Sequence, residues 1–165
     1  MGYLFALTCL LNVGWIATWL NYEILWSFVC NIGLWATLAW IYYQLAVSKT
    51  RPLYTIPISL YLGWIAVSII AHFNVLLIDM EYAFMGMDQE NWTIILVSIT
   101  IIGGLLMHYW NRDIVFNLVL IWALLGTYSK HYQLSNEMVF TLIAGVFVLG
   151  LVTVLVGWRK VYLIK

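Results

Sequence analysis

The sequence predicts an all-α protein, a polytopic membrane helix bundle with about six transmembrane helices in a single domain over residues 1–165. The first observation is composition: 65% of the residues are hydrophobic, 8% are charged, and the mean hydropathy is +0.97. A soluble domain carries about 25% charged residues, so this chain lacks the polar surface of a water-soluble globule. The second is a series of long apolar segments, and the third is a one-sided distribution of Lys and Arg.

Six segments are long and apolar enough, or nearly so, to cross the hydrocarbon core, which takes about 20 residues. They cover residues 3–20, 24–47, 56–78, 92–110, 114–130 and 139–158. Helices are expected because open sheet edges would leave backbone groups unpaired in lipid. No cleavable signal peptide is expected, since residues 1–3 carry no basic group.

The first three segments carry polar and aromatic side chains at helical spacing. The first has Asn12, Trp15 and Trp19, the second has Asn31 and Trp35, and the third has Tyr61, Trp64, Ser68 and His72. At 100° per residue, the four positions of the third segment fall within about 80° of one another. Polar groups are costly in hydrocarbon, so these stripes are expected to face the interior of the bundle.

The other features of the segments concern helix starts and helix packing. Pro52 and Pro57 flank the start of the third segment, in the first helical turn where proline is tolerated. Gly103 and Gly104 lie inside the fourth segment, where such a pair marks a kink or a close helix contact. The fifth segment is the weakest, because it is short and ends in the polar residues 128–130.

The distribution of basic residues predicts the orientation in the membrane. When the loops are numbered alternately, the side with both termini holds six basic residues and the other side one. The six are Lys49, Arg51, Arg112, Arg159, Lys160 and Lys165, and the one is Lys130. The positive-inside rule then places both termini in the cytoplasm and the acidic loop around residues 79–91 outside.

Several classes of function find no support in the residues. The net charge of zero gives no basic surface for nucleic acid. The three histidines, His72, His108 and His131, have no metal-binding spacing, so no metal site is expected. Cys9 and Cys30 lie in apolar runs and form no redox motif. No catalytic triad or paired carboxylates are present, so an enzyme is not expected, and no charged pathway indicates a transporter.

Three short motifs resemble those of one known family. Residues 11–15 read LNVGW, residues 61–64 read YLGW after Pro57, and residues 116–124 read FNLVLIWAL. The first resembles the L-N-x-x-W stretch of the TspO/MBR family, the tryptophan-rich sensory proteins related to the translocator protein. The second resembles that family's P-Y-x-x-W segment, and the third the C-terminal extension of its longer bacterial branch.

The resemblance implies a division of the chain. Residues 1–80 would be the TspO-like part, with three helices that correspond to the third, fourth and fifth of the family's five. Residues 81–165 would be a C-terminal helical extension of three more. The family's first two helices and its Pro-Pro-x-Trp loop have no counterpart, so we expect a chain without these N-terminal helices. His72 stands where the longer branch usually has Asn, and Ser68 where it usually has Ala.

The resemblance implies a membrane protein, expected in the bacterial inner membrane, that binds a planar hydrophobic ligand such as a porphyrin, with a sensory or transport role. Trp and Tyr suit such a guest because they offer flat faces with a polar tip. The ligand-binding residues would be Asn12, Trp15, Trp19, Trp35, Tyr61, Trp64, Ser68 and His72. Haem is a further candidate ligand, and the expected partners are the lipid bilayer, a tetrapyrrole and a second copy in a homodimer.

A second interpretation stays open from the residues alone. Asn, Ser and His commonly form hydrogen bonds between membrane helices. The stripes would then only join helices, and the protein would be a structural or partner-binding membrane subunit without a small-molecule ligand.

Overall fold

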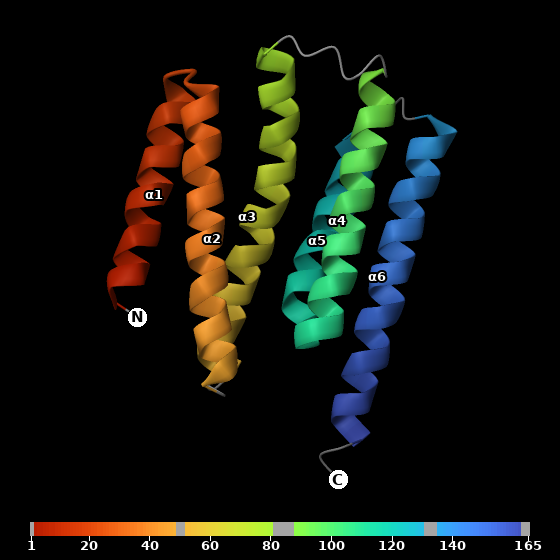
Figure 1. Cartoon of the computed structure of the whole chain (residues 1–165). Helices are drawn as coiled ribbons and strands as arrows, with labels where there is room; N and C mark the ends of the chain where they lie inside the picture. Colours follow the sequence, from red (N-terminus) through yellow and green to blue (C-terminus); the bar gives the residue numbers. More distant parts are fainter. Residues whose placement is uncertain (1, 49–51, 81–87, 131–134, 163–165) are drawn as a thin grey trace. The chain divides into compact units, whose positions relative to one another are not determined.

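The computed structural model describes residues 2–48, 52–80, 88–130 and 135–162, and within them the chain forms six α-helices (Figure 1). They are α1 (Gly2–Leu20), α2 (Ile24–Val47), α3 (Pro52–Asp79), α4 (Gln89–Asn111), α5 (Ile114–Lys130) and α6 (Asn136–Tyr162). Five are long and apolar enough to cross a membrane, and α5 is a shorter apolar helix. The predicted all-α polytopic membrane fold is therefore confirmed.

The boundaries of α1, α2 and α5 lie within one residue of the predicted spans, whereas α3, α4 and α6 extend beyond theirs by one to four residues at each end. The start of α3 shows why. The helix begins at Pro52 rather than at residue 56, and Pro57 lies inside it. A proline suits the first helical position because the N–H it lacks has no partner there. Pro57 is different, because it leaves the carbonyl of Leu53 without its helical donor. Tyr54 and Thr55 lower the mean hydropathy of the first turn, so the predicted span began after it.

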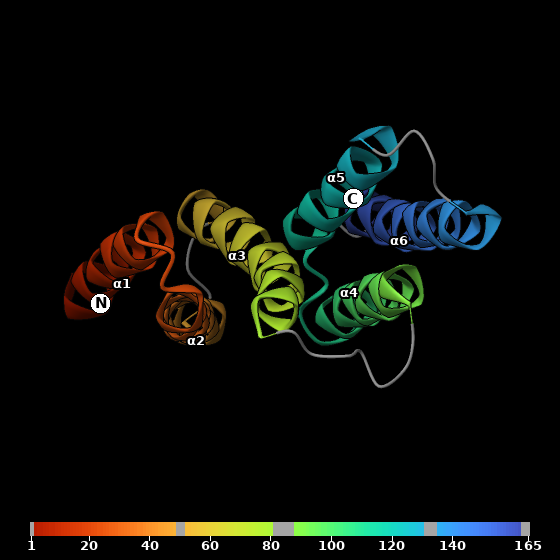
Figure 2. The same cartoon turned by 90° about the horizontal axis from the view of Figure 1, so that it is seen from above.

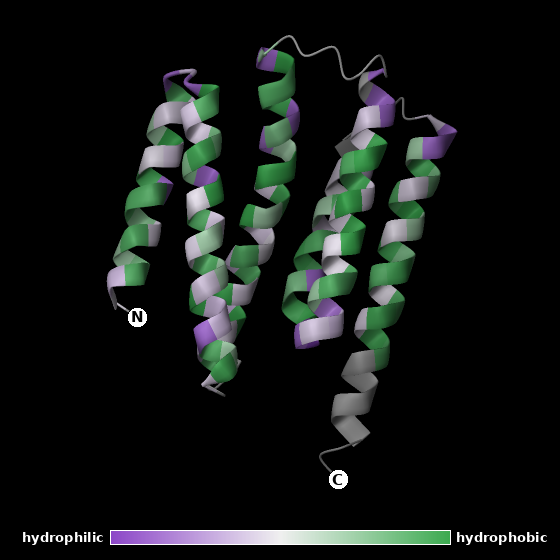
Figure 3. Cartoon of the chain, in the orientation of Figure 1, coloured by the Kyte–Doolittle hydropathy of each residue, from purple (hydrophilic) through white to green (hydrophobic). Residues whose placement is uncertain are grey.

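Hydrophilic residues are concentrated at the helix ends, and hydrophobic residues predominate along the helices (Figure 3). Many large apolar side chains remain exposed, such as Phe5, Leu20 and Trp26, which are 59%, 70% and 61% exposed. Such a surface is unfavourable in water but matches the hydrocarbon of a bilayer. The helices therefore present to lipid what a soluble protein would bury.

The described helices fall into two compact units, Met1–Gly86 and Met87–Lys165. In the first unit, α2 packs against both α1 and α3 (Figure 2). Its core includes Leu34 and Leu38 of α2 with Leu62 and Ile65 of α3, all nearly or fully buried. Small residues let α1 approach α2, since a Cβ built on Gly14 would lie 3.4 Å from the sulfur of Cys30.

In the second unit, each of α4, α5 and α6 packs against the other two. Asn117 of α5 is fully buried and lies between His108 of α4 and Thr153 of α6. Its Nδ2 atom is 3.4 Å from His108 Nδ1 and 3.4 Å from Thr153 Oγ1. Gly104 faces the same position, because a Cβ built there would be 3.3 Å from Asn117 Oδ1. The glycine pair was expected to mark either a kink or a close helix contact, and Gly104 lies at a close helix contact.

Two polar residues of the second unit cap the N-termini of the helices that follow them. Asp113 precedes α5, and its Oδ1 accepts hydrogen bonds from the backbone N–H groups of Val115 and Phe116 at 2.9 and 3.1 Å. Ser135 precedes α6, and its Oγ accepts from Met138 N–H at 3.2 Å. Such caps satisfy N–H groups that have no partner inside the helix. The caps define where each span begins.

Candidate ligand pocket between the first and third helices

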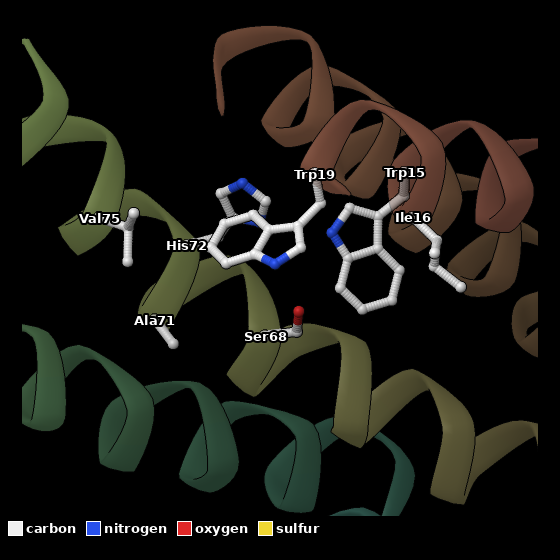
Figure 4. A pocket seen from close by; sticks show the side chains of 7 residues that line it. All are labelled: Trp15, Ile16, Trp19, Ser68, Ala71, His72 and Val75. Atoms are coloured by element: carbon white, nitrogen blue, oxygen red, sulfur yellow. The ribbon is translucent and has the colours of Figure 1, made fainter. Parts of the chain in front are cut away.

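A pocket of about 360 Å³ lies in the first unit between α1 and α3 (Figure 4). Its lining comes from one face of each helix: Trp15, Ile16 and Trp19 of α1, and Ser68, Ala71, His72 and Val75 of α3. The two sets follow helical spacing, with positions three or four residues apart. The walls are mostly apolar, and the lining residues that carry a polar group are two tryptophans, one serine and one histidine.

His72 joins all three helices of the unit. Its ring meets the edge of the Trp19 indole of α1, with centroids 4.8 Å apart and planes at 74°. The Phe28 ring of α2 lies on another side, with centroids 5.8 Å apart. The imidazole also donates a hydrogen bond to the backbone of Ile24, at the start of α2. With 5% of its surface exposed, His72 is held in one orientation by these neighbours.

Ser68 lies one turn before His72 and connects α3 to α2. Its Oγ accepts a hydrogen bond from Asn31 Nδ2 at 3.0 Å. Asn31 is fully buried, and its Oδ1 atom has no partner among the described residues. This hydrogen bond is the kind that joins membrane helices. The same serine also lines the pocket, so one residue takes part in both helix packing and the pocket wall.

Trp15 is positioned by its backbone and leaves its indole nitrogen unpaired. The carbonyl of Trp15 accepts a hydrogen bond from Ser27 Oγ of α2 at 3.2 Å. Its Nε1 atom is buried without a partner among the described residues, and so is His72 Nε2. A buried polar group without a partner costs free energy. Two residues that line the pocket therefore each carry a buried nitrogen with unused hydrogen-bonding capacity.

The structure brings together four of the eight residues expected to bind a ligand. Trp15, Trp19, Ser68 and His72 share the pocket. The other four, Asn12, Trp35, Tyr61 and Trp64, do not belong to its lining. The α2 helix, which carries Trp35, contributes no side chain to the wall. Asn12 lies three residues before Trp15 on α1, and Tyr61 lies seven residues before Ser68 on α3.

The expectation that the whole stripe of α3 faces the bundle interior is wrong for Trp64, whose side chain is 43% exposed. The buried face of α3 is centred on Leu62, Ile65 and Leu76. At 100° per residue, His72 lies near that centre and Trp64 about 80° further round the helix. An amphipathic indole tolerates this position at the lipid surface. Trp35 on α2 is likewise 38% exposed.

Three lining residues were missed because they are apolar. Ile16, Ala71 and Val75 carry no polar group and look like any lipid-facing side chain in the sequence. Their signal was their spacing, since Ala71 and Val75 follow Ser68 by three and seven residues. Phe28 of α2 was missed for the same reason, although its ring packs against His72.

The metal-binding side chains do not cluster. Among the residues that the structure describes, no group of three or more His, Cys, Asp or Glu could hold a metal ion. The cysteines are free, with Cys9 exposed and Cys30 half-buried. The pocket chemistry available to a guest is therefore aromatic packing with a few hydrogen bonds.

Comparison with known proteins identifies the family. The family model described as TSPO-like protein matches residues 1–156. The chain belongs to the TSPO-like family. No curated protein and no solved structure matches it. The resemblance to the TspO/MBR family drawn from the short motifs is thereby confirmed. The matched residues include the four predicted ligand-binding residues that line the pocket.

Proposed function

We propose that this TSPO-like membrane protein binds a planar hydrophobic ligand, such as a porphyrin, against the indoles of Trp15 and Trp19, and serves a sensory or transport role rather than a catalytic one. The observation that carries the proposal is the aromatic pocket beside the buried imidazole of His72. Its volume of about 360 Å³ falls in the range of about 300–1,000 Å³ common for small-molecule sites. Haem is included as a candidate guest.

A ligand-free structural subunit is the second candidate, and one observation favours it. The hydrogen bond from Asn31 to Ser68 shows that polar side chains of the stripe join helices. The two functions make different demands on the pocket. Helix joining needs only the buried bonds, whereas ligand binding also needs the indole faces that line the cavity.

Replacement of Trp19 by alanine is expected to weaken porphyrin binding about tenfold, because an aromatic contact contributes about 0.5–1.5 kcal/mol beyond its buried area. The matched control is Trp64→Ala, which removes an indole of α3 that does not line the pocket. Titration with a free-base porphyrin in detergent, followed by tryptophan fluorescence quenching, measures both affinities. Equal affinities of Trp19→Ala, Trp64→Ala and the unchanged protein would favour the structural subunit.

We also propose that the protein lies in the bacterial inner membrane with both termini in the cytoplasm. Support comes from the six-to-one distribution of basic residues. In this orientation the pocket lies towards the outer side, because it is formed by the second halves of α1 and α3. A homodimer in the bilayer belongs to the same proposal, with exposed aromatic side chains such as Trp26 and Trp40 as candidate contacts.

Labelling of single cysteines tests the orientation. In a variant without Cys9 and Cys30, a membrane-impermeant maleimide should label Met85→Cys from outside intact cells and leave Thr50→Cys unlabelled. After the cells are opened, both should react. Labelling of Thr50→Cys alone in intact cells would reverse the proposed orientation.

A further inference from the structure

A second cavity lies in the unit Met87–Lys165, so no part of it belongs to the aromatic pocket of the first unit. It is an open groove of about 560 Å³ between the first two turns of α4 and the first two turns of α6. Its lining consists of Asn91, Ile94 and Ile95 of α4 and Asn136, Glu137, Phe140 and Thr141 of α6. None of the functions proposed above uses this groove.

A hydrogen bond between the two helix starts holds the walls of the groove together. Glu90, at the start of α4, accepts through Oε1 from the backbone N–H of Ser135, the residue before α6, at 2.9 Å. Next to Glu90, Asn91 Nδ2 donates to Asp88 Oδ1 at 3.0 Å. The helices α4 and α6 thus begin at the same end of the second unit (Figure 1), and both run away from it in the same direction.

The groove is polar at the helix starts and apolar about one turn further along. The apolar spans of the two helices begin at Glu90 and Asn136, so this end of the groove lies at the boundary between water and hydrocarbon. Ile94, Ile95 and Phe140 follow, and Phe140 is 75% exposed. An exposed apolar surface with a polar rim is typical of a site that contacts lipid or an apolar ligand.

The lining carries a single charge. Glu137 is the one charged residue among the seven, and its side chain is exposed, so its carboxylate is accessible to a cation. The hydroxyl of Thr141 donates to the backbone carbonyl of Glu137 at 2.8 Å. The carboxamides of Asn91 and Asn136 and the first backbone N–H groups of α6 provide donors. A primary ammonium group suits the carboxylate, and a phosphate suits the start of a helix.

We propose that this groove binds phosphatidylethanolamine, with its ammonium group on the Glu137 carboxylate, its phosphate at the start of α6 and an acyl chain over the apolar part of the groove. Charge complementarity separates this lipid from others. Phosphatidylglycerol has no cation and brings a negative phosphate to a lining whose one charge is negative. Phosphatidylcholine has a cation without an N–H to donate. The proposal does not depend on the ligand of the pocket between α1 and α3.

Three lipids with the same acyl chains test the preference for the headgroup: phosphatidylethanolamine, phosphatidylcholine and phosphatidylglycerol. The full chain is purified in detergent, freed of lipid and titrated with each, and native mass spectrometry measures the fraction that carries one lipid. We expect phosphatidylethanolamine to bind about threefold or more tightly than the other two, an effect of the size that an ion pair at a surface produces. Equal affinities for the three lipids would overturn the proposal, and this comparison needs no variant.

Glu137→Gln assigns the preference to the groove, because it removes the charge with little change in shape. In this variant phosphatidylethanolamine should lose its advantage over phosphatidylcholine. The matched control is Glu23→Gln, which removes an exposed carboxylate of the first unit that makes no capping hydrogen bond at the start of α2. It should keep the preference. A preference that survives Glu137→Gln, or that is lost equally in Glu23→Gln, would overturn the proposal.

Phe140→Ala tests the position of the acyl chain. It should weaken the binding of all three lipids about twofold or more, because it removes apolar area that the chain covers. The order of the three headgroups should stay the same, since the carboxylate of Glu137 remains. Unchanged affinities for all three lipids would show that the chain lies elsewhere and would overturn the proposed mode of binding.

Discussion

Gly104→Ala is expected to destabilise the protein by about 1–3 kcal/mol, the usual cost of forcing an extra methyl group into a close-packed core. A Cβ at this position would lie 2.7 Å from Leu120 Cδ1 and 2.9 Å from Leu149 Cδ2. These atoms belong to α5 and α6, and their side chains are 2% and 0% exposed. Because both leucines are buried and belong to two different helices, the added methyl group must displace their side chains or the helices that carry them.

The adjacent glycine is a matched control for this prediction. A Cβ on Gly103 would meet nothing within 4 Å. Gly103→Ala should therefore stabilise the helix slightly, because alanine costs about 0.5–1 kcal/mol less than glycine inside a helix. Thermal unfolding of the two variants in detergent, with the unchanged protein beside them, makes the comparison. Similar unfolding temperatures for both variants would refute the close contact of α4 with α5 and α6.

Leu34→Ala is expected to destabilise the protein by about 2 kcal/mol, at the low end for a large-to-small substitution in a core. Leu34 lies in the middle of α2 and is fully buried. Part of the usual cost of such a change comes from transfer between water and the core. In a membrane protein a leucine separated from its neighbours still lies in hydrocarbon, so mainly lost packing remains.

Leu25→Ala on the same helix is the control, because Leu25 is 47% exposed. Its side chain contacts lipid before and after unfolding of the bundle, so the change should stay within about 0.5 kcal/mol. Unfolding by denaturing detergent, followed by helix content, measures both variants. A cost for Leu25→Ala equal to that for Leu34→Ala would mean that this face of α2 is packed against a partner, as in the proposed homodimer.

The family fold and the pocket differ in how far the residues alone could determine them. Each helix was recognisable because a span must be continuously apolar, a property that belongs to one segment and needs no partner. The helix breaks at Tyr22 and Arg112 were also readable as short polar stretches, and both residues adopt a positive φ, of 61° and 50°. The early start of α3 was not readable, because Thr55 and Tyr54 lower the local hydropathy without ending the helix.

The sequence by itself determined the class, the six helices, the short breaks between them and the family, because hydropathy, helix length and local motifs are properties of single segments. Only the tertiary structure decided that Trp15 and Trp19 share a pocket with Ser68 and His72 while Trp64 faces outward. A stripe spans an arc of about 80° on its helix, and the sequence does not say which edge of that arc meets a neighbour. That choice follows from the packing of α2 against α1 and α3, which places Asn31 beside Ser68 and Phe28 beside His72 and leaves Trp64, at the other edge of the stripe, 43% exposed.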